Sequence, residues 1–339
     1  MPLAGPSRAE LALLQLRARS AKATMESTLD LRRRSTGLLS TALFIAMHAA
    51  VLFVFVVPVS PFLLALCLGS YLLRMWAITA GYHRYFSHRS FRTSRAFQLV
   101  MAFLGTTAMQ NGPLWWASWH RRHHKHSDGP GDTHSPVQRG FVHAHIGWFL
   151  DGSHDTPDLS NVRDLARYPE LRFLDRHKWM PIVAYALLMF AIAGVPGLVW
   201  GFVVSTILCL HATACINSLA HLWGSRRYAT DDDSRNNPFL ALITLGEGWH
   251  NNHHFDMNAA RQGRTFWELD VTYTTLKILE TLGIVWDLRA PSARLLSSIG
   301  ERGSSEGRAR SPIVRPVGQS VPPEPLVGAQ PAGVGAGSV

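Results

Sequence analysis

Four apolar segments restrict the fold of this chain more than any other feature of its sequence. They lie at about residues 38–58, 61–81, 181–194 and 197–216. A helix of about 20 apolar residues spans the hydrocarbon core of a bilayer. Charged residues make up only 17% of the chain, against roughly 25% in a typical soluble domain. The sequence therefore predicts an all-α integral membrane protein with four transmembrane helices in two hairpins.

The distribution of positive charge indicates how these helices are oriented. The net charge is +10, and residues 82–180, between the two hairpins, carry many Lys and Arg residues. Loops rich in Lys and Arg stay on the cytoplasmic side, so we expect this loop and both termini in the cytoplasm. The basic residues do not form one patch interleaved with aromatic residues, and a nucleic-acid surface is not expected.

Composition divides the chain into three parts. Residues 1–37 are predicted to form a charged cytoplasmic arm, without the apolar stretch of a secretory signal. Residues 38–290 form the membrane domain. Residues 291–339 are dominated by Ser, Gly, Pro and Arg, which predicts a disordered tail. The apolar stretches 96–109 and 238–246 are too short to span and are expected to be interfacial or re-entrant.

Histidines recur at three places that each follow an apolar stretch. The segments are GYHRYFSHRSF, SWHRRHHKHSD and GEGWHNNHHFD. Their candidate ligands are His83, His88, His120, His123, His124, His250, His253 and His254. In H-x-x-H-H the three side chains share one face of a helix. The first pair is five residues apart, so its rings converge only if the helix ends or distorts between them.

Eight imidazoles at one membrane border indicate two metal ions, because a single ion cannot use eight ligands. A ninth candidate, His221, follows the fourth apolar segment, and Asn217 lies one turn before it on the same face. The three cysteines form no C-x-x-C pair, and the His-Glu dipeptide of hydrolytic zinc sites does not occur. Metal ions that are bound by histidines alone and lie beside lipid indicate redox chemistry on an apolar substrate, and iron is the metal that we expect.

The three segments, together with NSLAHLWG around His221, closely resemble the membrane fatty acid desaturases of the stearoyl-CoA (acyl-CoA delta-9) type over about residues 40–290. The resemblance implies four spanning helices with a cytoplasmic helical cap. It also implies an enzyme that uses O2 to insert a cis double bond mid-chain into a saturated acyl-CoA or acyl-lipid.

The resemblance further implies two iron ions, Fe2+ or Fe3+. One would be held by His83, His88, His120, His124 and His253. The other would be held by His123, His221, His250 and His254, with Asn217 acting through a water. The ring N–H groups that face away from the metals need partners, and the candidates are Glu247, Asp128, Asp132 and Asp256.

One departure from the family leaves the acyl carrier open. Acyl-CoA enzymes commonly carry an acidic residue directly before the first histidine of the first triplet, where this chain has Ser118 and Trp119. No haem-binding H-P-G-G is present, so electrons are expected from a separate ferredoxin, flavoprotein reductase or cytochrome b5 type of donor. Two other functions remain open: a hydroxylase or alkane monooxygenase with the same irons, and a histidine-rich metal transporter.

Several residues inside the apolar segments have other expected roles. Tyr71 lies twelve residues before the first ligand, about 18 Å along a helix, and is predicted with Cys67 to close the acyl tunnel. His48 and His211 are interpreted as packed residues within the spans. Arg74 is expected to extend to the membrane interface.

Overall fold

The computed structural model describes residues 35–293, 295 and 297. The predicted arm, apart from its last three residues, and nearly all of the predicted tail lie outside them. Residues 1–296 and 297–339 are separate units, and the elements below belong to the first.

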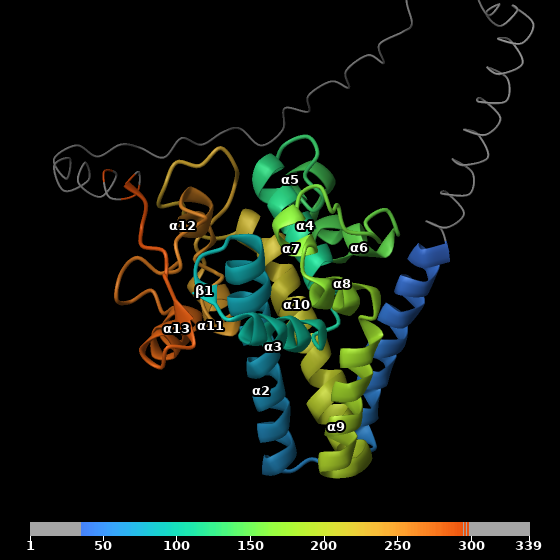
Figure 1. Ribbon diagram of the computed structural model, residues 1–339. Coiled ribbons are helices and arrows are strands. Elements are labelled where there is room, and N and C mark those ends of the chain that lie inside the picture. Colours follow the sequence, from blue (N-terminus) through green and yellow to red (C-terminus); the bar gives the residue numbers. More distant parts are fainter. Residues whose placement is uncertain (1–34, 294, 296, 298–339) are drawn as a thin grey trace, which may run out of the picture. The chain divides into compact units, whose positions relative to one another are not determined.

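Helices make up almost all of the regular structure in this part of the chain (Figure 1). The long apolar helices are a helix at residues 35–51 with η1 (Leu52–Phe55), α2 (Pro61–Trp76) with η2 (Ala77–Ser87), and α9 (Trp179–Gly197) with η4 (Leu198–Val204), α10 (Ser205–Asn217) and η5 (Leu219–His221). The others are α3 (Arg95–Thr106), α4 (Pro113–His126), α5 (Pro136–Arg139), η3 (His143–Gly147), α6 (Trp148–Leu150), α7 (Arg163–Ala166), α8 (Pro169–Arg176), α11 (Pro238–Ile243), α12 (His250–Phe255) and α13 (Val271–Thr281). Strands β1 (Arg92–Thr93) and β2 (Val285–Trp286) pair antiparallel.

Three helical stretches among the described residues are long and apolar enough to cross a membrane. They are Ser35–Phe55, Pro61–Ser87 and Trp179–His221. The second begins where Pro61 occupies the first turn of α2 and Ser60 accepts a hydrogen bond from the Leu63 N–H (3.2 Å). It continues six residues beyond the predicted end at residue 81.

The third stretch, 43 residues long, is interrupted and turns back on itself. Ala193 and Gly194 have non-helical torsion angles, with φ of +61° at Gly194. Across this break, a Cβ at Gly201 would lie 2.7 Å from the Met189 sulfur. Residues twelve apart on a continuous helix would be about 18 Å apart along its axis. The contact therefore requires a hairpin, which matches the predicted break between residues 194 and 197.

Arg74 does not extend to the interface, so this expectation was wrong. Its side chain is 0% exposed. The guanidinium donates to the Thr206 hydroxyl (2.6 Å) and the Thr107 carbonyl (3.3 Å), on α10 and at the end of α3. Polar groups of neighbouring helices satisfy the cation inside the protein, which removes the reason for it to reach water.

The main apolar core lies where η2 packs against α3 and α4, at one end of the long helices. Tyr82 and Phe86 of η2, Met101 of α3 and Leu114 of α4 are all buried there. Gly105 allows this close approach, since a Cβ at that position would lie 2.3 Å from the Tyr82 ring. The core thus fixes η2 and α4, which carry two of the three histidine segments.

Candidate metal centre

The first pair of histidines lies on a helix with wide turns. In the π-helical segment η2, hydrogen bonds join residues five apart. At its end, the N–H of His88 donates to the carbonyl of His83 (3.2 Å). This distortion brings the two rings together, with centroids 4.8 Å apart.

The two histidine triplets lie on α4 and α12, so each presents its side chains from one helix. Two glycines set the path of the chain into α12. Gly246 has φ of +125°, and a Cβ at Gly248 would lie 2.0 Å from the Ala241 backbone nitrogen. Only glycine fits at such a close backbone approach. The segment GEG before His250 therefore positions this helix against α11.

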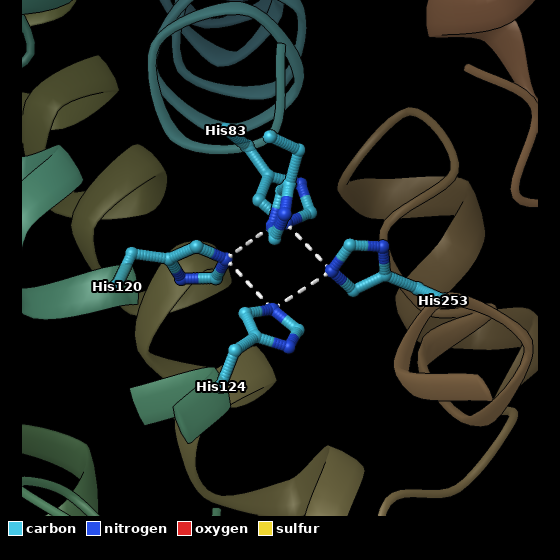
Figure 2. A group of neighbouring side chains, drawn as sticks. His83, His120, His124 and His253 are labelled. Atoms are coloured by element: carbon cyan, nitrogen blue, oxygen red, sulfur yellow. Dashed lines mark hydrogen bonds between the residues drawn. The ribbon is translucent and has the colours of Figure 1, made fainter. Parts of the chain in front are cut away.

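The nine histidines fall into two groups, in each of which one ring nitrogen per residue lies within 4.8 Å of the others. The first group is His83, His88, His120, His124 and His253. The second is His123, His221, His250 and His254. In Figure 2 the nitrogens of four members of the first group point to one centre, and His253 Nε2 lies 3.0 Å from His83 Nε2 and from His124 Nε2. The grouping is the one that the family resemblance implies.

Carboxylates accept the Nδ1 protons of four of these histidines. The pairs are His83–Glu247, His123–Asp132 (3.0 Å), His221–Asp128 (2.7 Å) and His254–Asp232 (2.6 Å). Such partners fix the tautomer and orientation of a ligand ring. Three of the four acids were expected from the sequence.

One carboxylate expected beside a ligand histidine has another partner, and one carboxylate that does contact a ligand histidine was not predicted. Asp256 accepts a hydrogen bond from the Ser292 N–H (3.0 Å) rather than from a histidine, so its predicted role was wrong. Asp232 takes that role for His254. It belongs to the run of three acids at residues 231–233, which gave no sequence signal for any single member.

The lowered pKa values of six of these histidines suit a metal site. Burial, reinforced by neighbouring histidines, lowers the pKa of His88, His120, His124, His250 and His253 well below the usual value. Burial likewise lowers the pKa of His254 to about 4, although Asp232 opposes the shift. Neutral imidazole is the form that binds metals. The Nε2 of His254 is buried without a partner among the described residues, as an atom reserved for a ligand would be.

A partly enclosed cavity lies beside His120 of the first group. His120 and Asn217 line it, together with the aromatic side chains of Trp115, Trp116, Trp119, Trp148 and Phe149. A mostly apolar wall with a few polar groups is typical of ligand pockets. Asn217 thus places a polar group in the wall of the cavity that also contains His120.

Tyr71 and Cys67 do not line this cavity. The Tyr71 hydroxyl donates to the Ile243 carbonyl, and Cys67 is buried among the long helices. Their assignment as the end of the acyl tunnel stays a prediction.

Comparison with known proteins identifies the chain's relatives. Residues 59–273 match the fatty acid desaturase family model. A probable chloroplastic lipid desaturase of Arabidopsis thaliana is 41% identical over 63% of this chain and 60% of its own length. An acyl-CoA C20 delta5-desaturase of Anemone leveillei is 39% identical over 64% of this chain and 70% of its own length. An sn-2 palmitoyl-lipid 9-desaturase of Nostoc sp. is 36% identical over 61% of this chain and 74% of its own length.

The matched region contains all nine histidines of the two groups. The chain spans 60% of the length of the Arabidopsis relative, so the match concerns this shared region. Since the family model covers more than half of the sequence, the chain belongs to the fatty acid desaturase family.

Proposed function

We propose that this protein is an oxygen-dependent fatty acyl desaturase with two iron ions, which inserts a cis double bond near the middle of a saturated acyl chain. One observation carries the proposal: two groups of converging imidazoles lie together, and His120 of the first group lines a cavity with an apolar, aromatic wall. Oxidation of an apolar chain needs both features in contact.

The reaction explains why redox metals are needed. An unactivated methylene has no acidic proton, so no base in the protein can break its C–H bond. Bound iron would supply oxygen activation that removes hydrogen from such a carbon. All-imidazole sets of five and four nitrogens suit iron among other metals, and the reaction named in the relatives' descriptions favours it.

The protein's own residues bind the acyl chain and orient the histidine rings. The aromatic wall of the cavity excludes water and holds the acyl chain against His120. Asn217 holds a water toward the second group. Asp128 and Asp132 keep the Nδ1 protons of His221 and His123 in place, so the opposite nitrogens face inward as acceptors.

The membrane arrangement completes the proposal. The hairpin at Ala193–Gly194 lets the stretch Trp179–His221 cross twice, which gives four crossings within residues 35–221. The basic content of residues 82–180 supports a cytoplasmic location for the centre and both termini. A separate ferredoxin, flavoprotein reductase or cytochrome b5 type of donor supplies the electrons there.

Substrate details belong to the same proposal. The double bond is at the delta-9 position, as in the name of the Nostoc relative. The acyl carrier is CoA or a membrane lipid. At the position where acyl-CoA enzymes carry an acid, Trp119 lines the cavity and offers no charge.

The test is expression in a desaturase-deficient host, followed by gas chromatography of fatty acids with location of the double bond. A mid-chain cis alkene supports the proposal. An alcohol product would identify a hydroxylase or alkane monooxygenase. Metal uptake into vesicles without oxygen consumption would identify a transporter.

A further inference from the structure

Three histidines outside the two metal groups form a hydrogen-bonded chain. His48 lies on the helix at residues 35–51, His211 on α10 and His145 on η3. His48 Nε2 is 2.9 Å from His211 Nε2, and His211 Nδ1 is 2.9 Å from His145 Nε2. His145 Nδ1 is 2.9 Å from the Ser218 hydroxyl. The chain thus joins three separate elements.

The proton positions in this chain follow from one carbonyl. His48 Nδ1 is 2.7 Å from the Phe44 carbonyl, which can only accept. A neutral His48 therefore accepts at Nε2 from His211, which in turn accepts at Nδ1 from His145. Every ring nitrogen meets one partner, whereas four or five nitrogens converge in each metal group. These three rings are therefore linked in a row by hydrogen bonds, and their nitrogens do not converge on one point as metal ligands do.

This connection crosses the side of the cavity that faces the helix at residues 35–51. Phe149 lines the cavity, and its ring centroid is 6.4 Å from that of Phe44. Leu210, the neighbour of His211, also lines the cavity. On the opposite side, the cavity wall on α4 is backed by η2 and α8.

The helix at residues 35–51 has little protein around it. None of its most apolar stretch is buried, against 44% for the corresponding part of Pro61–Ser87. Leu38 is 72% exposed, and Ile45 is 60% exposed. In a bilayer these side chains contact lipid. A single helix therefore separates Phe149 from the hydrocarbon.

We propose that the seam between this helix and α10 opens sideways to the bilayer and admits the acyl chain of a membrane lipid into the cavity, with His48, His211 and His145 as the latch that closes it. The proposal rests on the desaturase function and specifies its substrate as a chain esterified to a glycerolipid. Such a chain already lies in the bilayer beside the seam. The hydrogen bonds of the latch form only when the two helices have one relative position, so the seam has a defined closed state.

The first test closes the seam covalently. In a background with Cys67, Cys209 and Cys215 replaced by alanine, Phe44→Cys and Phe149→Cys are joined by a short, cleavable bifunctional thiol reagent. Vesicles of dipalmitoyl phosphatidylcholine supply the substrate, and an added reducing system supplies electrons. We expect turnover to fall at least tenfold on cross-linking and to return on cleavage, with iron content unchanged. The two single-cysteine variants, treated alike, control for modification alone.

Full turnover of the cross-linked enzyme would overturn lateral entry. If the enzyme desaturates palmitoyl-CoA but no phospholipid after the cross-link is cleaved, the proposed glycerolipid substrate is wrong. The desaturase assignment then stands. Absence of any unsaturated product when the unsubstituted protein is given either substrate would instead refute the proposed function.

The second test measures the latch without catalysis. Phe149→Cys is labelled in membranes with an apolar maleimide that partitions into lipid. His211→Leu, which breaks the chain at its centre, should raise the labelling rate at least threefold, and the exposed residue change His177→Leu should not. An unchanged rate in His211→Leu would overturn the latch.

Discussion

His221 and Asp128 form a 2.7 Å hydrogen bond across 93 residues of sequence. His221 ends the last apolar helical stretch, and Asp128 follows the first histidine triplet on α4. Asp128 also accepts from the Asp233 N–H (2.9 Å). One carboxylate therefore connects three segments around the second histidine group.

Asp128→Asn should weaken metal binding by about 10–100-fold, because loss of a charged partner disturbs the tautomer and orientation of its histidine. Iron retention against increasing chelator measures the effect. Asp287→Asn, which changes an acid paired with Arg92 at the surface, is the matched control and should retain iron. Equal retention in both variants would mean that Asp128 is not needed for the site.

His250→Ala should abolish desaturation and reduce the iron content from about two per chain, because it removes one of four nitrogens from the second group. Elemental analysis of the purified protein checks this, with His177→Ala as the control. An active preparation that holds one zinc and no iron would contradict the two-iron proposal.

His221→Ala should be as inactive as a triplet variant, whereas Asn217→Ala should keep its iron and lose only part of its activity. The reason is that His221 belongs to a ligand group and Asn217 lines the cavity beside it. Iron content and turnover, measured on the same samples, separate the two roles. Wild-type turnover in His221→Ala would assign that residue a structural role only.

Chain-length preference tests two positions against each other. If Tyr71 closes the tunnel, Tyr71→Ala should shift products toward longer chains. If the cavity ends among the residues that line it, Leu210→Ala should produce that shift. Product profiles from a mixture of saturated substrates decide between them. A ratio unchanged in Tyr71→Ala, with activity intact, places Tyr71 away from the substrate.

The metal-free protein should lose stability as the pH falls below about 6.5. The folded-state pKa of His254 is about 4, against about 6.5 in an unfolded chain. Between these values the unfolded state binds more protons, so the free energy of unfolding decreases as the pH decreases. Between pH 7.5 and pH 5, Asp128, with a folded-state pKa of about 2, stays charged in both states and contributes little. Thermal unfolding of chelator-treated protein at pH 7.5 and pH 5 measures the loss, and equal melting temperatures would contradict it.

The apolar segments and the histidine spacing were sufficient to predict much of the helical arrangement. Their lengths place the helices, and H-x-x-H-H needs only a regular helix to align its side chains. The pair His83 and His88 was different, because its convergence depends on a π-helical segment that no spacing rule requires.

Contacts between segments far apart in the chain could not be predicted from the sequence. Asp232 meets His254 only because the loop after His221 folds back over α12. Arg74 is satisfied by Thr206, and His48 by His211, through packing between helices. Polar residues in apolar segments suggest that partners exist, but their identity depends on which helices become neighbours.

The two histidine groups also set an order on maturation. Each group takes side chains from α4 and from α12, so the first is complete only at His253 and the second only at His254, more than 100 positions after the ligands on α4. The three membrane-spanning candidates among the described residues all precede α12 in the chain. We therefore expect the proposed metal ions to bind after membrane insertion, and a chain truncated before α12 should insert normally yet be unable to hold either ion.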